Sequence, residues 1–213
     1  MINYTLNLLD VTKIFGRRLI FDKINYEFSS GSVYGLAGKN GSGKSTLAKI
    51  IAGILSPTRG KVSHKQDGEI IIPENLHDHL GFVSPYLVLY DEFTAGENLV
   101  HFSRIRGDQI DNEKIKFWLD KFNLYDRRDD LLKGFSSGMK QRMKIIFALL
   151  HEPRLIIFDE PTSNLDNEGK DKVYEIINEQ GKENTVIVAS NEDSDLALCG
   201  QVLQVEDFKN KNE

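Results

Sequence analysis

The stretch "SVYGLAGKNGSGKSTLAKIIAGIL" covers residues 32–55 and joins two kinds of pattern across a run of glycines. Residues 32–38 form an aliphatic segment that ends in glycine, which is typical of a buried strand. Downstream, apolar side chains recur at helical spacing and a proline follows. These apolar residues are Leu47, Ile50, Ile51, Ile54 and Leu55. The stretch therefore predicts a strand, a tight glycine loop and a helix over residues 44–55.

Residues 38–45 fit the pattern G-x-x-x-x-G-K-[ST] of a phosphate-binding loop. Glycine lets the backbone turn through positive φ, so that successive N–H groups point inward at the start of the helix. Lys44 adds a positive charge beside the terminal phosphates, and Ser45 offers a hydroxyl to Mg²⁺. The predicted nucleotide-binding residues of the loop are Gly38, Lys39, Asn40, Gly41, Ser42, Gly43, Lys44, Ser45 and Thr46. The alternative is an ordinary glycine-rich turn, which the strand-to-helix context disfavours.

An acidic pair follows a second aliphatic run, "RLIIFDE", at residues 154–160. Ligands gather at the carboxyl ends of strands in open α/β sheets, which is where Asp159 would lie. Asp159 is the predicted partner of Ser45 in holding Mg²⁺. Glu160 points differently and is the predicted group that orients or deprotonates an attacking water. The alternative, a solvated acidic loop, is disfavoured by the phosphate loop upstream.

The rest of the chain predicts an α/β fold with a mostly parallel sheet and a helical insertion. The first thirty residues have the β-forming runs "YTLNLLDV" and "INYEFSS". Residues 91–150 are mainly helical in pattern, with Leu99, Phe102 and Ile105 along one side of one helix. The next helix has a face made of Ile115, Trp118, Leu119 and Phe122, which we interpret as core packing. Strand "RLIIFDE", helix "NEGKDKVYEIINEQ", strand "TVIVAS" and a last strand "QVLQVED" complete the chain.

The composition favours a globular protein of a reducing compartment. The chain has 213 residues, which suits one domain with a small inserted subdomain, and 40% of its residues are hydrophobic. Its net charge of -5 gives no sign of nucleic-acid binding. A single cysteine, Cys199, excludes an internal disulfide. No apolar run approaches the ~20 residues of a membrane-spanning helix, and we expect no signal peptide.

At this point the sequence resembles the ATP-binding subunits of ABC transporters. The resemblance rests on "GKNGSGKS", "FSSGMKQR" and "LIIFDEPTSNLD" in this order, and it covers nearly the whole chain. It implies an ABC ATPase fold: a P-loop core, an N-terminal antiparallel β subdomain and a helical subdomain that contains the signature motif. The expected boundaries are 1–85 and 151–213 for the core with the β subdomain, and 86–150 for the helical subdomain.

The resemblance also implies a site shared between two copies. The signature residues Ser136, Ser137, Gly138 and Met139 are expected to close on the ATP bound by a partner, as a homodimer or pseudo-dimer. Hydroxyls and free N–H groups at a helix start suit an anion, although Ser136 also reads as a simple N-cap. Asp166 is expected in the loop that crosses the dimer interface. Phe15 lies where the family has an aromatic that stacks on adenine; the alternative is a packed strand phenylalanine.

Two positions depart from the family pattern. A glutamine is expected after the strand "GFVS", but Pro85 stands there, with Ser84 as the neighbouring hydroxyl that could substitute. A histidine is expected after "TVIVAS", but Asn191 stands there. Asn191 can donate an amide hydrogen to the γ-phosphate but cannot exchange a proton. We count Asn191, Lys44 and Glu160 as the catalytic residues and expect slow Mg-ATP hydrolysis. The signature is also altered at Ser137 and Met139, where glycine and glutamine are usual.

The sequence therefore predicts an ATPase subunit that powers a membrane transporter. The implied partners are a second ATP-binding subunit and a polytopic membrane subunit, at the cytoplasmic face of the membrane, without nucleic acid. A haem-exporter-like subtype is one possibility. Two alternatives stay open: an ABC-type ATPase without a membrane partner, and a nucleotide-dependent regulatory module that does not turn over.

Overall fold

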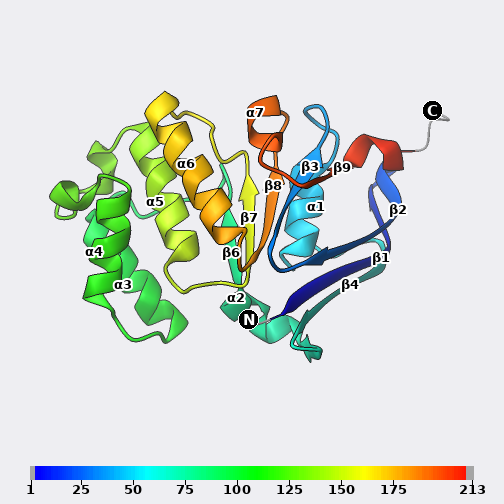
Figure 1. Ribbon diagram of the computed structural model, residues 1–213, viewed down its shortest axis with the longest axis horizontal. Coiled ribbons are helices and arrows are strands. Elements are labelled where there is room, and N and C mark those ends of the chain that lie inside the picture. The colour runs from blue at the N-terminus through cyan, green and yellow to red at the C-terminus, as the bar shows by residue number, and fades with distance from the viewer. Residues whose placement is uncertain (1–2, 210–213) are drawn as a thin grey trace.

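Two sheets lie side by side in the computed structural model, which describes residues 3–209 (Figure 1). A four-stranded antiparallel sheet has the order β2-β1-β4-β5, and a five-stranded parallel sheet has the order β6-β7-β8-β3-β9. The antiparallel strands are β1 (Tyr4–Phe15), β2 (Arg18–Ser29), β4 (Arg59–Gln66) and β5 (Glu69–Ile71). The parallel strands are β3 (Ser32–Ala37), β6 (Leu80–Val83), β7 (Leu155–Asp159), β8 (Thr185–Ala189) and β9 (Gln201–Gln204). The predicted α/β class with a mostly parallel sheet is confirmed.

The helices divide between the two sides of the parallel sheet. They are α1 (Lys44–Ile51), α2 (Leu76–His79), α3 (Ala95–Arg106), α4 (Asn112–Lys121), α5 (Ser137–Leu149), α6 (Asn167–Gln180) and α7 (Asp193–Leu196). Short 3-10 turns occur at Pro73–Asn75, Tyr125–Arg127, Leu132–Gly134 and Val205–Phe208. Figure 1 shows α3, α4, α5 and α6 on one side, whereas α1 and the antiparallel sheet lie on the other. All segments between β6 and β7 are helical or irregular.

Strand β7 separates the two cores of the molecule. Its five residues are all fully buried, which is the pattern of a strand covered on both faces. Ile156 and Phe158 pack into the core on the helical side. Leu155 and Ile157 pack into the core beneath α1 and the antiparallel sheet. Since neighbouring side chains of a strand point to opposite faces, one short aliphatic run joins both cores.

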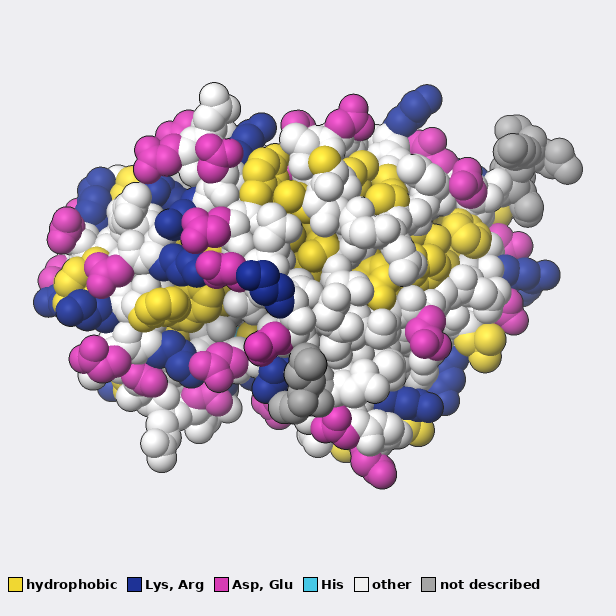
Figure 2. All heavy atoms as spheres, in the orientation of Figure 1, with side chains coloured by type: hydrophobic (Ala, Val, Ile, Leu, Met, Phe, Trp, Pro, Cys, Tyr) yellow, Lys and Arg dark blue, Asp and Glu magenta, His cyan; other side chains and the backbone are white. Residues whose placement is uncertain are grey.

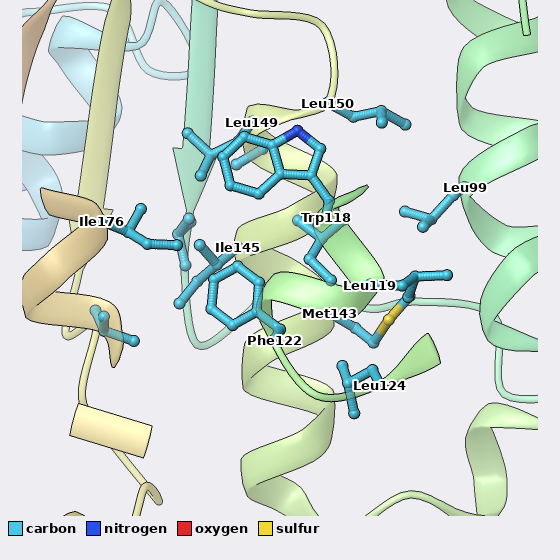
Figure 3. Packing of buried hydrophobic residues seen from close by; sticks show 14 of the residues in the cluster. Leu99, Trp118, Leu119, Phe122, Leu124, Met143, Ile145, Leu149, Leu150 and Ile176 are labelled. Atoms are coloured by element: carbon cyan, nitrogen blue, oxygen red, sulfur yellow. The ribbon is translucent and has the colours of Figure 1, made fainter. Parts of the chain in front are cut away.

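The predicted apolar face of α4 lies inside the helical core, where Figure 3 shows Trp118 and Phe122 among side chains of α5 and α6. Leu119 is fully buried, and Ile115 and Trp118 are each 7% exposed. The interpretation of this face as core packing is confirmed. Val173, Ile176 and Ile177 of α6 are likewise fully buried.

Three local expectations were wrong. Helix α1 ends at Ile51 rather than residue 55, because the chain turns at Gly53 with a φ of 72°, and Ile54 is consequently 61% exposed. The last strand stops at Gln204, and residues 205–208 form a 3-10 turn. Ile105 does not continue the buried side of α3: it is 77% exposed, whereas Leu99 is fully buried.

The surface shows no large patch of a single charge on the face drawn in Figure 2, where basic and acidic side chains alternate over the helical half. Between residues 3 and 209, no helix combines the length and the apolarity that a membrane crossing requires.

Candidate nucleotide-binding site

The phosphate loop follows β3 and leads into α1 through glycines with positive φ. Gly38, Gly41 and Gly43 have φ values of 144°, 76° and 112°, which L-residues with a Cβ rarely adopt. A Cβ at Gly38 would also lie 2.6 Å from the Ser42 Oγ, and one at Gly43 would lie 2.6 Å from the Ile20 Cγ2. Backbone conformation therefore favours glycine at all three positions, and lack of space adds to this at Gly38 and Gly43.

Helix α1 begins differently from the other long helices. Among residues 3–209, α3, α4, α5 and α6 each have a side chain that caps the first turn, from Thr94, Asp111, Ser136 and Asp166. The residue before α1 is Gly43, and no side chain accepts a hydrogen bond from its first turn. The amide groups at this end are left for another acceptor, and the helix dipole favours an anion.

Lys44 lies back along the loop and is only 5% exposed. Its Nζ donates to the Gly38 carbonyl at 2.7 Å and to the Lys39 carbonyl at 3.3 Å. Burial lowers the pKa of Lys44, while the negative charges of Glu160, Asp159 and Glu206 act in the opposite direction. A buried ammonium held by neutral carbonyls gains by acquiring a negatively charged partner.

Ser45 and Asp159 come together although they are far apart in sequence. The Ser45 Oγ donates to the Asp159 Oδ1 at 2.8 Å. Asp159 is fully buried, and its second oxygen, Oδ2, has no hydrogen-bond partner among residues 3–209. Burial raises the pKa of Asp159, opposed by the Ser45 hydrogen bond and by nearby lysines. A buried carboxylate with a free oxygen beside a hydroxyl is a suitable donor set for Mg²⁺. The described residues hold no cluster of three His, Cys, Asp or Glu side chains that would bind a metal alone, so phosphate oxygens and water would complete this site.

A cleft of about 470 Å³ opens above the loop. Its walls include Asn40, Gly41, Gly43, Lys44, Ser45, Thr46, Phe15 and Glu160 from the sequence predictions. They also include Arg18, Ile20 and Tyr86, which no motif indicated. Tyr86 follows Pro85 directly, so an aromatic side chain of the cleft neighbours the position that departs from the family pattern.

Phe15 and Glu160 both line this cleft but differ in how they are held. Phe15 ends β1 and is 48% exposed, with the Lys13 Nζ 4.7 Å from its ring centroid. Glu160 has a φ of 52°, a strained conformation for a residue with a side chain. Its N–H donates to the Ala189 carbonyl at 2.9 Å, which fixes it beside the end of β8. Such strain is common where a side chain is held for function.

Asp195 ties the turn after the acidic pair to the end of β8. It is 1% exposed and accepts hydrogen bonds from the Thr162 Oγ1 at 2.9 Å and the Ser190 Oγ at 2.7 Å. The Tyr174 hydroxyl adds a third at 2.9 Å. Asn191 follows Ser190 and is exposed. The sequence did not indicate Asp195, because its role depends on residues that are distant in the chain.

The signature residues lie outside this cleft. Ser136 and Ser137 are exposed at the start of α5, and Gly138 and Met139 follow in its first turn. The Ser136 Oγ accepts from the Met139 N–H at 3.2 Å, so Ser136 does act as an N-cap. None of the four lines the cleft above the phosphate loop. Asp166 is exposed and caps α6 by accepting from the Gly169 N–H at 2.9 Å.

Ser84 does not replace the missing glutamine at the cleft. It is 3% exposed, and its Oγ accepts from the Tyr86 N–H at 3.3 Å. One further contact was not foreseen: the Glu206 Oε1 accepts from the Lys39 N–H at 2.9 Å. The C-terminal 3-10 turn thus contacts the phosphate loop.

The uncapped helix, the glycine loop, Lys44 and the Ser45–Asp159 pair together define a P-loop nucleotide-binding protein. Residues 21–163 match the family described as ABC transporter, and the chain belongs to this family. It is 30% identical over 205 residues to the uncharacterized ABC transporter ATP-binding protein YybJ of Bacillus subtilis, covering 94% of this chain and 92% of that one. It is 28% identical over 212 residues to the bacitracin transport ATP-binding protein BcrA of Enterococcus faecalis, covering 96% and 67%. A solved structure described as the ATP binding subunit of an ABC transporter has a TM-score of 0.81 at 27% identity, covering 94% of this chain and 86% of that chain.

Proposed function

We propose that the chain is the ATP-hydrolysing subunit of a membrane transporter and that the residues above have the roles the sequence predicts. The observation that carries the proposal is the Ser45–Asp159 hydrogen bond of 2.8 Å beside an uncapped helix start. The loop amides and Lys44 would bind the phosphates, with Lys44 exchanging its two carbonyl partners for phosphate oxygens. Ser45 and Asp159 would hold Mg²⁺, which neutralises charge on the phosphates when bound.

Glu160 is the proposed base of hydrolysis. It lines the cleft, and its backbone is fixed by the bond to Ala189, so its carboxylate can orient or deprotonate a water beside the γ-phosphate. Asn191 offers an amide donor from the neighbouring strand end. We expect turnover to be slow, because Asn191 cannot transfer a proton and Pro85 has no polar side chain.

A second copy would complete the site. Ser136–Met139 are absent from the walls of the cleft and stand exposed at a helix start, which supports a role toward the nucleotide of another subunit. Asp166 would lie in the loop at this interface. Residues 86–150 would then act as a helical subdomain, distinct from the core formed by residues 1–85 and 151–213.

A membrane subunit is the proposed second partner. The segment after Pro85 exposes three large apolar side chains: Tyr86 at 74%, Val88 at 85% and Tyr90 at 64%. Such a group of apolar side chains is typical of a protein contact. BcrA is named for bacitracin transport, which supports a place at the cytoplasmic face of the membrane. The haem-exporter-like subtype stays a prediction, since the relatives reported above have other names.

Four proteins test the proposal: wild type, Glu160→Gln, Lys44→Met and the control Glu192→Gln, which changes an exposed acid. We expect steady-state phosphate release from wild type and the control, and a loss of at least tenfold in Glu160→Gln with Mg-ATP still bound. Lys44→Met should weaken ATP binding by about a hundredfold, because a charged partner of the phosphates is lost. Equal turnover in wild type and Glu160→Gln would remove Glu160 as the base. Unchanged ATP affinity in Lys44→Met would overturn the site itself.

Assembly is tested with the same Glu160→Gln variant in sedimentation experiments. With Mg-ATP we expect a dimer, because the slow variant holds intact ATP between two copies, and with ADP we expect a monomer. A monomer under all conditions would contradict the shared site.

One alternative function is favoured by specific residues: Pro85 and Asn191 suit a nucleotide-dependent regulatory module. A regulatory module of this kind would bind ATP tightly, and the wild-type protein would release no phosphate.

A further inference from the structure

The segment from Ser84 to Asp91 connects the cleft with the exposed apolar side chains. It leaves the end of β6 and passes Tyr86, which lines the cleft and has the Lys49 Nζ 4.7 Å from its ring centroid. Within the segment the Leu87 N–H donates to the Ser84 carbonyl at 3.1 Å, which forms one turn. We name residues 84–91 the cleft segment. The contacts that fix the cleft segment therefore also determine the position of Tyr86.

Two lysines of α5 bind the two ends of the cleft segment. The Lys144 Nζ donates to the Pro85 carbonyl at 2.8 Å and to the Ser84 carbonyl at 3.4 Å. The Lys140 Nζ pairs with the Asp91 Oδ1 at 2.7 Å. Lys140 and Lys144 are four residues apart and so lie on one face of the helix. The helix that begins with the signature residues therefore contacts the cleft segment at both ends.

The two contacts differ in their surroundings. Lys140 and Asp91 are 31% and 52% exposed, and an ion pair of this kind contributes little. Lys144 is half-buried, and none of the ion pairs found between residues 3 and 209 includes it. Burial lowers the pKa of Lys144, and the nearby Lys140 acts in the same direction. Burying an ammonium without a carboxylate costs free energy unless hydrogen bonds compensate, and Lys144 has such bonds to two backbone carbonyls. It donates to backbone carbonyls, so its contact is independent of which side chains the segment has.

The same helix also contacts the turn after the acidic pair. Gln141 is 4% exposed, and its Nε2 donates to the Pro161 carbonyl at 3.1 Å. Gln141 and Lys144 are three residues apart and reach toward the two sides of the cleft. A movement of α5 would consequently displace both the cleft segment and the turn that follows Glu160.

We propose that Lys144 is a positioning residue that fixes the cleft segment to the signature helix and so holds Tyr86 at the cleft. This inference rests on the proposed function, since it assumes that the cleft binds ATP. Lys144 acts on the backbone of Ser84 and Pro85, where a glutamine side chain is usual in the family. A linkage from the signature helix to the cleft is thus retained without that glutamine, provided by the helix instead of the segment.

The test compares Lys144→Met, Lys144→Arg and the control Lys172→Met, which lies on α6. Methionine keeps the length of the side chain and removes the ammonium group with its two hydrogen bonds, whereas arginine keeps a positive charge and N–H donors. We expect Lys144→Met to lower kcat by about tenfold and to change the Kd for ATP by less than twofold, because the segment positions groups and does not bind the phosphates. Lys144→Arg should recover most of the turnover, and Lys172→Met should match wild type.

Hydrogen exchange provides a readout that does not depend on activity. In Lys144→Met, the peptide that covers residues 84–91 should exchange about tenfold faster, while peptides of β7 and α1 stay at the wild-type rate. Wild-type exchange in residues 84–91 together with wild-type kcat would overturn this inference. If wild type itself neither binds nor hydrolyses ATP, the proposed function fails instead, and the exchange result still decides whether Lys144 fixes the segment. Since Gln141 continues to tether α5, we expect Lys144→Met to fold, and Lys144→Gln provides a second variant that keeps a neutral amide donor group.

Discussion

The two halves of the molecule, on either side of β7, use different means to reach the same cleft. The half with α1 and the antiparallel sheet supplies the phosphate loop, in which nine consecutive residues act together. The helical half supplies Lys144 and Lys140, which contact the cleft segment, and Gln141, which contacts the turn after the acidic pair. Their partners are two backbone carbonyls and a carboxylate, 20 to 59 residues away. The proposed nucleotide-binding residues of one half are therefore neighbours in the sequence, whereas the other half is connected to them through long-range contacts.

This difference suggests a division of roles: the phosphate loop would bind ATP, and the contacts of α5 would couple the helical half to the cleft. The phosphate loop lies directly between β3 and α1, and its glycines set its conformation through positive φ. The cleft segment depends on packing of the helical half, because Lys140 and Lys144 of α5 bind its ends and Asn98 of α3 bonds to the Tyr90 backbone at 3.0 Å. Changes in the helical half should consequently alter turnover before they alter nucleotide affinity, unless they unfold the whole molecule.

The largest expected effect comes from the helical core. Phe122 is 1% exposed and lies between α4, α5 and α6, so Phe122→Ala should lower the free energy of unfolding by about 3–5 kcal/mol. Because β7 belongs to both cores, we expect both halves to unfold together. The single tryptophan, Trp118, reports on the helical half, and binding of a fluorescent ATP analogue reports on the other half.

Urea unfolding followed by both signals checks this prediction, with Phe117→Ala as a control because Phe117 is 56% exposed. Both signals should shift to lower urea by the same amount in Phe122→Ala and hardly at all in Phe117→Ala. A Trp118 transition at lower urea than the loss of nucleotide binding would show that the halves unfold independently.

The proposed site residues of the nucleotide half could be predicted from the sequence, because most of them are neighbours in the chain. Gly38–Ser45 are contiguous, and the aliphatic run before Asp159 marks the end of a buried strand. Spacing also predicted the buried face of α4 correctly, since 3.6-residue periodicity depends only on local geometry. Ile54 was misplaced because the turn at Gly53 ends the helix before the apolar pattern ends.

Contacts between distant elements were not readable from the sequence. Lys144, Asp195 and Glu206 act on groups 59, 33 and 167 residues away, and two of these contacts end on backbone atoms. A backbone carbonyl or N–H occurs at nearly every residue, so no side-chain motif marks its partner. Tyr86 likewise belongs to no motif, and its place at the cleft depends on contacts of the folded chain.

A medium effect is expected from pH in the half with the antiparallel sheet. His64 is 7% exposed and bonded to the Tyr4 hydroxyl at 2.8 Å, and burial lowers its pKa from 6.5 to about 4. The unfolded chain binds this proton more readily than the folded chain, so stability is present above pH 6.5 and is lost as the pH falls toward 4. His64 alone should lower the free energy of unfolding by roughly 2 kcal/mol between pH 7.5 and pH 5.

Urea unfolding at several pH values measures this loss in wild type and His64→Gln. The variant should lose less stability on acidification, and His77→Gln, whose side chain is 61% exposed, should behave like wild type. His151, in the helical half, also has a pKa lowered to about 4 by burial and by Arg106, so part of the slope should persist in His64→Gln. A His64→Gln profile that follows wild type throughout would contradict the assignment of this slope to His64.

The smallest effect, at Glu206, tests how far the nucleotide half is self-contained. The Glu206 carboxylate accepts from the Lys39 N–H at 2.9 Å, and its negative charge reaches Lys44. Glu206→Gln keeps the acceptor and removes the charge, so it should lower the Kd for ATP by about threefold through reduced repulsion of the phosphates. Glu206→Ala also removes the acceptor and should lose this gain, because the Lys39 N–H is left without its partner.

The Kd for ATP of each protein is measured at low and at high salt. The control is Asp207→Asn, which changes an exposed neighbouring acid. Since screening weakens repulsion between partly exposed charges, the advantage of Glu206→Gln over wild type should shrink at high salt. An equal Kd for wild type and Glu206→Gln at low salt would show that the C-terminal turn supports the phosphate loop through its hydrogen bond alone.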